Sequence, residues 1–392
     1  MDIPYLNFDL LIEIGEDGAF SHVLDSPAGT ALARIDLQVD RQELRDFWQR
    51  VDQPHQQDFD RMIAQYDITR RFGTRLFQSV FVDEIRRCLY ASLNNAFQSR
   101  SRLRLRLIFQ GDLNLSHLPW EYLYDPAHSE FLSLSVQVPM VRYMNLLHNI
   151  RPWPIQWPLR VLVAITSPKN HPPLHVENEW LALVDTVDHL AFDKKMVIER
   201  LEDPTLVGLQ KQLRKKEYHA FHFVGRGSVD GVARDGMLLF EDKMGRGRFI
   251  SGSHLGTMLS DHPSMRFAFL NIRQEGPAYN QNPFVLAAES MIRRGLSAVI
   301  ATPFEPSPFA TFTFIDEFYA ALTSLLAVDL AAANARRIVL SEEKSASWGA
   351  PICITRTDNG QLFYDPKVES PPLSPSIAPD RDRPDNLYLK YL

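Results

Sequence analysis

Hydrophobic and polar residues follow two different periods along the chain, and the change of period separates strands from helices. Short runs that alternate or are wholly apolar predict strands, whereas longer runs with apolar residues every three or four positions predict amphipathic helices. In the first 150 residues this pattern predicts strands at 8–14, 19–24, 32–37 and 103–109, a helix starting at Asp40 and a longer helix over 74–97. Asp40 is a good N-cap because Glu43 follows three residues later. We therefore expect a mixed β/α module over residues 1–150.

From residue 151 onward, strands and helices alternate regularly. A proline-rich stretch at 151–158 precedes this part, and we expect it to be an extended linker because proline forbids helix and removes a backbone donor. The pattern predicts strands at 159–165, 195–200, 218–224, 266–271, 297–301 and 351–355, helices at 176–190, 204–214, 253–260, 284–294, 309–326 and 329–341, and a hairpin around 245–247. Such alternation implies an α/β fold with a mostly parallel sheet flanked by helices.

Residues 366–392 break this pattern, since several prolines stand among serine and aspartate. The composition predicts a mobile tail after an α/β domain over residues 151–365. The tail ends in the apolar cluster Leu387–Leu392, which we expect either to fold back onto this chain or to dock on a partner.

Length, charge and cysteine content exclude several classes of protein. At 392 residues and 45% hydrophobic content, the chain can bury one large core or two joined ones. A net charge of −6 gives no basic field for nucleic acid. Cys88 and Cys353 are too few for a disulfide framework, and no stretch is apolar over the roughly eighteen residues that a bilayer span needs. We expect a cytoplasmic protein without nucleic-acid or membrane partners.

Two predicted strands end abruptly in small or polar residues. The segment Phe221–Gly227 contains Gly-Arg-Gly, and the segment Phe269–Gln274 contains Asn-Ile-Arg. In an open α/β sheet, functional groups collect where such strands end. The candidate binding residues are Gly225, Arg226, Gly227, Arg273, Gln274 and Glu275.

These two segments resemble the His and Cys motifs of the CHAT-domain family, bacterial relatives of caspases and separases. Further similarity lies in the Pro-Trp-Glu-x-Leu-Tyr-Asp string that begins at Pro119, and the resemblance covers about residues 5–365. It implies a caspase-like fold. In the family the motifs end Gly-His-Gly and Asn-Ala-Cys, so Arg226 stands at the His position and Arg273 at the Cys position.

The resemblance therefore implies a cysteine-peptidase fold without its Cys-His dyad. A guanidinium stays protonated at working pH and can serve neither as nucleophile nor as base. We expect a catalytically inactive scaffold or regulator in a bacterial stress or defence circuit, bound to a protease or to a protease target, without cofactor or metal. The alternatives are an anionic-ligand sensor and a peptidase or other hydrolase that uses a different site. The oligomeric state stays open.

Other residues are less suited to this chemistry. His222 lies four residues before Arg226, about 13 Å away at ~3.3 Å per strand residue, and is interpreted as a packed strand histidine. Cys88 and Cys353 lie in apolar surroundings and are interpreted as small buried hydrophobes. Adjacent side chains such as those of Ser260-Asp261-His262 cannot form a catalytic relay. The histidines and glutamates His171, His175, Glu177 and Glu179 lack a zinc-ligand spacing, and the glycine pairs 225/227 and 245/247 lack the features of a phosphate loop.

Three further features of the sequence give expectations about charge and packing. The two cationic strand ends repel, so solvent, Glu275 or a bound anion should offset their charge. Alternating arginines at 100, 102, 104 and 106 predict a strand with one solvated face. The aromatic residues around Trp120 are expected to pack one part of the chain on the other, in preference to binding a ligand.

Overall fold

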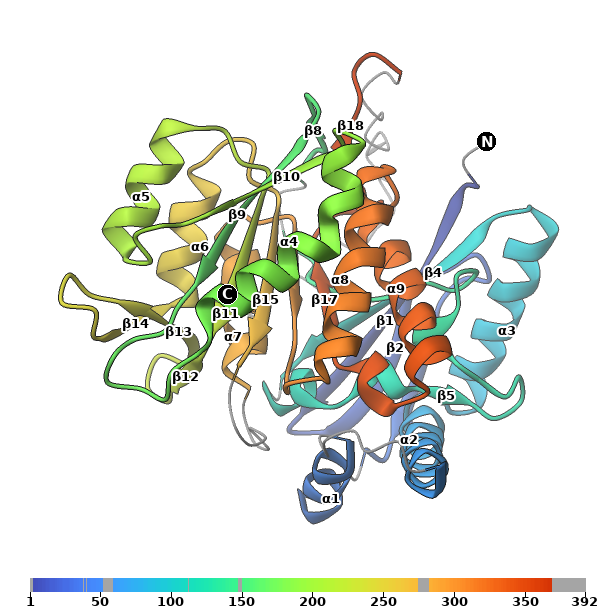
Figure 1. Ribbon diagram of the computed structural model, residues 1–392. Coiled ribbons are helices and arrows are strands. Elements are labelled where there is room, and N and C mark those ends of the chain that lie inside the picture. Colours follow the sequence, from blue (N-terminus) through green and yellow to red (C-terminus); the bar gives the residue numbers. More distant parts are fainter. Residues whose placement is uncertain are drawn as a thin grey trace.

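A twisted eleven-stranded sheet runs through the part of the chain that the computed structural model describes, residues 3–37, 39, 41–51, 59–111, 113–146, 150–273 and 282–368 (Figure 1). The strands lie in the order β10 (Met196–Arg200), β9 (Leu159–Ile165), β11 (Ala220–Gly225), β15 (Phe267–Ile272), β16 (Ala298–Ala301), β17 (Ile352–Thr355), β7 (Met140–Tyr143), β4 (Arg102–Gln110), β1 (Tyr5–Gly15), β2 (Gly18–Asp25) and β3 (Ala31–Ile35). Neighbours are parallel except in the pairs β16–β17, β1–β2 and β2–β3.

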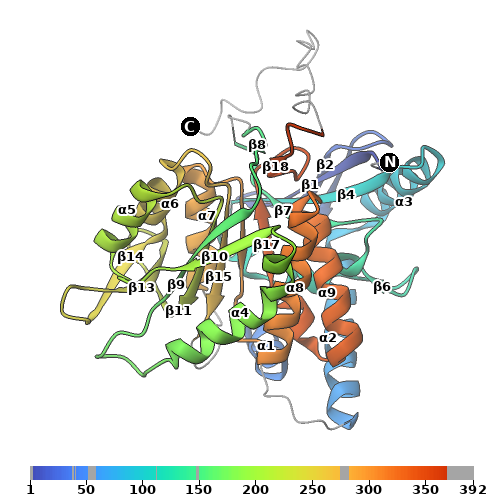
Figure 2. The same cartoon turned by 45° about the horizontal axis from the view of Figure 1, so that its top comes forward.

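Helices cover both faces of the sheet, as the alternating pattern predicts. One face carries α4 (Val176–Phe192), α8 (Pro308–Thr323) and α9 (Val328–Glu343), and the other carries α5 (Leu206–Lys215), α6 (Gly252–Ser260) and α7 (Pro283–Arg294) (Figure 2). The N-terminal strands are accompanied by α1 (Arg41–Val51), α2 (Phe59–Val80) and α3 (Asp83–Gln98). The prediction of an α/β fold with a mostly parallel, helix-flanked sheet is confirmed.

Short elements complete the described part. The predicted hairpin around 245–247 belongs to a three-stranded antiparallel sheet of β12 (Gly227–Asp230), β13 (Asp235–Glu241) and β14 (Gly247–Ser251). The proline-rich stretch is extended and forms β8 (Trp153–Pro154), which pairs with β18 (Phe363–Tyr364), and β5 (Tyr124–Asp125) pairs with β6 (Glu130–Phe131). Single 3₁₀ turns lie at Leu113–His117, Trp120–Tyr122, Leu132–Leu134 and Ala346–Gly349. No described helix combines the length and the apolar character that a membrane crossing requires.

The sheet crosses the predicted boundary at residue 150. Strand β7 from the first part pairs in parallel with β17, the last strand that the second part adds to this sheet, at Arg142↔Ile354 and Tyr143↔Thr355. One hydrophobic core also takes side chains from both parts. The two parts therefore share one sheet. That residues 1–150 and 151–365 are separate domains stays a prediction.

The predicted helix over 74–97 was wrong in its extent. Two helices occupy this region, and they meet at Phe81 and Val82. Val82 is extended, with φ −74° and ψ 169°, and the fully buried Phe81 fixes the bend. Asp83 and Glu84 then occupy the first turn of α3, where negative charge favours a helix N-terminus. Apolar periodicity continues across the bend, so the pattern alone did not reveal it.

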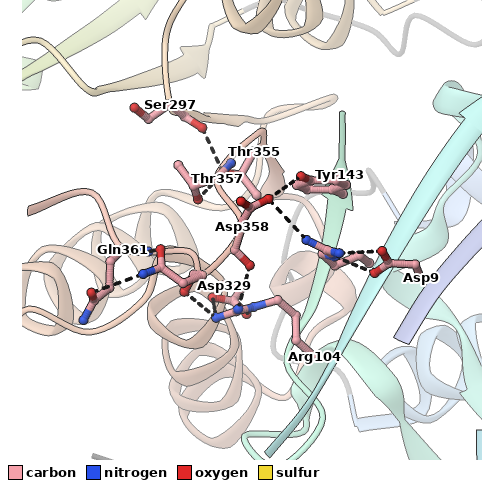
Figure 3. A network of polar contacts seen from close by, with 11 residues as sticks. Asp9, Arg104, Tyr143, Ser297, Asp329, Thr355, Thr357, Asp358 and Gln361 are labelled. Carbon is pink, nitrogen blue, oxygen red and sulfur yellow. Dashed lines mark hydrogen bonds and ion pairs between the residues drawn. The ribbon is translucent and has the colours of Figure 1, made fainter. Parts of the chain in front are cut away.

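The prediction of a solvated arginine face on β4 was wrong for two of its residues. Arg104 is 2% exposed and donates from Nε to Asp329 Oδ2 at 2.6 Å, while Arg106 is 7% exposed and pairs with Asp9 (Figure 3). The leucines between them are buried as well, so both faces of this strand are covered. Asp329 lies 225 positions away along the chain, which is why strand alternation could not show it.

The aromatic cluster around Trp120 is confirmed as packing. Tyr122 lies with its ring centroid 4.9 Å from that of Trp348, and its hydroxyl donates to the carbonyl of Ala346 at 2.6 Å. Glu121 accepts from Arg142 Nε at 2.9 Å, and both side chains are buried. This string therefore joins the N-terminal part to the turn before β17.

Candidate functional site

The first candidate segment lies at the carboxyl end of β11. Gly225 closes that strand and Gly227 opens β12, with Arg226 between them. A Cβ on Gly225 would lie 2.4 Å from Thr166 Oγ1, and one on Gly227 would lie 2.8 Å from the ring of Phe284. Close packing thus requires both glycines, which explains the small residues on either side of Arg226.

The second candidate segment lies beside the first one. Strands β11 and β15 are parallel neighbours with Gly225 opposite Ile272, and the backbone N–H of Arg273 donates to the carbonyl of Gly225 at 2.8 Å. The backbones of the two candidate arginines therefore meet at one edge of the sheet, as the two strand ends predict. Gln274 and Glu275 lie outside the described residues.

The Arg273 side chain is held in a buried ion pair. It is 6% exposed, and Glu179 of α4 accepts from Nε at 2.7 Å and from Nη2 at 2.8 Å. Nη1 donates to Asn271 Oδ1 at 3.2 Å, and Glu305 lies 3.7 Å from Nε. A guanidinium pairs best with a carboxylate that accepts two parallel hydrogen bonds from it. Glu179 binds Arg273 in this way and offsets its positive charge.

Arg226 takes a different partner. Its Nη1 donates to the backbone carbonyl of Pro172, in the loop between β9 and α4, at 2.6 Å. The two guanidinium groups thus engage separate groups, one in a loop and one on α4. In the described part of the site, the positive charge of Arg273 is offset by carboxylates of the chain itself.

Glu179 is the partner of Arg273 that the sequence analysis missed, because Glu179 was considered there only as a metal ligand. Its position in the chain could have indicated this pairing. Helix α4 follows β9, which is parallel to and adjacent to β11, so the first turn of α4 begins at the same edge as both candidate arginines. An acidic residue in that turn is well placed to meet a cation at the strand ends.

The chain matches a known family over most of its length. The profile of the CHAT domain matches residues 70–361, about three quarters of the sequence. The chain belongs to the CHAT-domain family. No protein of curated function matches it.

Several solved structures resemble this CHAT domain at low sequence identity. The Arg-specific cysteine proteinase gingipain R is 10% identical, with 81% of this chain and 74% of that chain covered and a TM-score of 0.41. A chain of the Saccharomyces cerevisiae separase–securin complex is 11% identical, with 89% and 30% covered and a TM-score of 0.47, so this chain spans less than a third of it. The Drosophila initiator caspase Dronc is 11% identical, with 58% and 96% covered and a TM-score of 0.33.

The two thiols of this CHAT domain are buried away from the candidate site. Cys88 on α3 lies 3.3 Å from Ser26 Oγ and 3.7 Å from the carbonyl of Gly29. Cys353 on β17 is 1% exposed, and burial raises the pKa of its thiol. The thiolate is the reactive form of cysteine, so burial of this kind suppresses reactivity. The interpretation of both as buried hydrophobes is confirmed.

His222 is packed inside the sheet, as predicted. Its ring stacks on Phe269 with a centroid separation of 4.7 Å, and Nδ1 lies 3.1 Å from the Tyr319 hydroxyl. Burial, helped by the charge of Arg273, lowers the pKa of this imidazole to about 3. It therefore stays neutral at physiological pH and is enclosed by aromatic side chains.

The remaining polar candidates have structural partners. His262 Nε2 accepts from the backbone N–H of Tyr218 at 2.9 Å, so it fastens the turn after α6 to the residues just before β11. Glu177 pairs with Arg200 at 2.8 Å. Within the described residues, no three His, Cys, Asp or Glu side chains gather in a group that could hold a metal ion.

Proposed function

We propose that this CHAT domain is a pseudo-peptidase that binds a protein partner without cleaving it, and that the partner is a protease or the target of one. The proposal rests on one observation. The residues that follow the adjacent strand ends of β11 and β15 are Arg226 and Arg273, where nucleophilic catalysis would need a thiol and an imidazole. We further propose, from the family alone, that the complex works in a bacterial stress or defence circuit in the cytoplasm.

The ion pair of Arg273 favours a structural role for this cation over an anion sensor. A ligand carboxylate or phosphate would have to displace Glu179, which already makes two hydrogen bonds to a side chain that is 6% exposed. Glu305 adds a second negative charge 3.7 Å away. The cation is therefore stabilised by the fold, and Arg226 is left as the arginine more open to a partner.

Incubation of the purified chain with a bacterial proteome is expected to produce no new protein termini. The reason is that guanidinium groups follow the two described strand ends, where cysteine proteolysis would need a thiolate and an imidazole base. Mass spectrometry of N-terminal peptides is the measurement, and a catalytically competent cysteine peptidase serves as the positive control. Specific cleavage would overturn the proposal. Cleavage that survives replacement of Cys88 and Cys353 by alanine would assign a hydrolase of another class, and cleavage that disappears would assign a relocated thiol.

The substitution Arg226→Glu is expected to weaken partner binding about tenfold, or ~1.4 kcal/mol, since an arginine at the rim of a recognition site commonly contributes this much. The partner is first captured from native cells with the wild-type chain and then purified for a direct affinity measurement. Arg248→Glu on β14 is the matched control, because Arg248 is an exposed arginine outside the two candidate strand ends. Equal affinities of wild type and both variants would place the interface away from the candidate site.

A further inference from the structure

A cavity of about 560 Å³ lies between the strands β1, β4 and β7 and the helix α7. This volume falls in the range of roughly 300–1,000 Å³ that is usual for small-molecule sites. The cavity is separate from the candidate site. Because β17 runs antiparallel to β16 and parallel to β7, the carboxyl ends of β7, β4 and β1 point to the opposite edge of the sheet from those of β11 and β15.

Apolar side chains form somewhat more of the cavity wall than polar ones. Leu11 of β1 and Ile108 of β4 are direct neighbours in the sheet and form its floor. Leu24, Phe109, Met144, Leu146 and Ile354 add further apolar surface. Such a wall favours the apolar body of a ligand through burial of nonpolar surface.

A carboxylate on α7 projects toward this apolar space. The Glu289 side chain is 14% exposed, and its ion pair with Arg293 is long, at 3.9 Å. The Arg293 side chain is itself 57% exposed. Ser116 donates a hydrogen bond to it, but burial still raises the pKa of this carboxyl. The negative charge is thus only partly compensated by the chain, and a cation from outside would stabilise it.

Two carboxylates and two arginines line the cavity, and one of the arginines is already paired with a carboxylate outside the lining. Arg142 is already engaged, since Nε donates to Glu121 at 2.9 Å and Nη2 donates to the carbonyl of Leu118 at 3.1 Å. Burial lowers the pKa of His22, so this ring is neutral at pH 7. Glu13 contributes a second carboxylate to the lining.

We propose that this cavity binds a small amphiphilic amine, with the apolar body against Leu11 and Ile108 and the ammonium group beside Glu289. The ammonium group supplies both the positive charge and the hydrogen-bond donors that a carboxylate accepts. Nucleotides and carboxylate metabolites are disfavoured because Glu13 and Glu289 would repel them. Of the two arginines in the lining, Arg142 is already engaged by Glu121, and Arg293 lies 3.9 Å from Glu289.

Three matched probes test this assignment: 2-phenylethylamine, 2-phenylethanol and 3-phenylpropanoate. At about pH 8 the amine remains protonated, since alkyl ammonium groups titrate near 10. Isothermal titration is expected to give an affinity for the amine about tenfold above that for the alcohol, with the carboxylate weaker still. The amine should also raise the melting temperature, because it binds the folded state.

The variant Glu289→Gln is expected to reduce amine affinity to that of the alcohol and to leave alcohol affinity unchanged. Glu84→Gln on α3, outside the cavity, is the matched control and should bind the amine as the wild type does. If Glu289→Gln proves unstable, Leu24→Trp fills the cavity instead and should abolish binding of both amine and alcohol. Three outcomes would overturn the proposal: equal affinities for the three probes, no binding of the amine, or amine binding that neither variant changes. These outcomes are independent of the cleavage and partner experiments.

Discussion

Asp329→Ala is expected to lower the free energy of unfolding by about 3–5 kcal/mol, the usual loss when one partner of a buried ion pair is removed. Asp329 and Arg104 have side chains that are 1% and 2% exposed, so the remaining guanidinium would be buried with its main counter-charge gone. Arg104 would keep three weaker supports. Nη2 donates to the carbonyl of Asn359 at 2.7 Å, Nη1 donates to the carbonyl of Asp358 at 3.3 Å, and the guanidinium lies 4.2 Å from the centre of the Tyr5 ring. None of them carries a full negative charge.

Urea denaturation measures the free energy of unfolding, and two further variants serve as controls. Glu84→Ala removes the partner of Arg87 in an exposed pair at 3.8 Å and should change stability by less than about 1 kcal/mol. The double variant Arg104→Met/Asp329→Leu removes both charges and should recover most of the loss. A loss below 1 kcal/mol for Asp329→Ala would show that this pair does not hold α9 to β4.

Acidification from about pH 7.5 to about pH 5 is expected to remove about 2 kcal/mol of stability for each of two buried histidines, His219 and His222. Burial lowers the pKa of His219 to about 4 and that of His222 to about 3, against an ordinary value of 6.5. Below pH 6.5 the unfolded chain therefore binds protons that the folded chain does not bind. Their contribution to stability is complete above pH 6.5 and is lost as the pH falls toward the folded-state values.

The neutral ring of His219 has a specific task, since Nδ1 accepts the backbone N–H of Arg160 at 2.9 Å. Glutamine offers an acceptor without a titrating ring, so His219→Gln and His222→Gln should each flatten the pH dependence by about 2 kcal/mol over this interval. Burial raises the pKa of carboxyls such as Asp9, which acts in the opposite direction, so the comparison of each variant with the wild type is the decisive quantity. A parallel pH dependence in wild type and both variants would contradict the assignment.

The second part of the chain could be predicted closely from local patterns. Strand β9 was expected at 159–165 and occupies those residues, and α6 was expected at 253–260 and begins one residue earlier. Both are short segments whose period and bounding residues are local properties. The N-terminal part was harder, because α2 and α3 carry one continuous apolar periodicity across a bend that only packing of Phe81 defines.

The sequence predicted where the site residues lie in the sheet, but not which groups their side chains contact. Two apolar runs that end in Gly-Arg-Gly and Asn-Ile-Arg lie side by side, and the Arg273 amide bonds to the carbonyl of Gly225. The carboxylate that pairs with Arg273 is Glu179, which lies 94 positions earlier in the chain. Glu275, the partner considered from sequence, lies outside the described residues.

Residue type and local periodicity were enough to predict the alternating strands and helices after residue 150, the two cationic strand ends and the chemistry that a guanidinium forbids. The folded chain was needed to show that β7 joins β17, that Arg104 and Arg106 are buried, and that Glu179 neutralises Arg273. Each of these depends on groups far apart in the chain. Whether a charged side chain is solvated or buried in a pair is set by the neighbour that folding brings to it, and no local pattern records that neighbour.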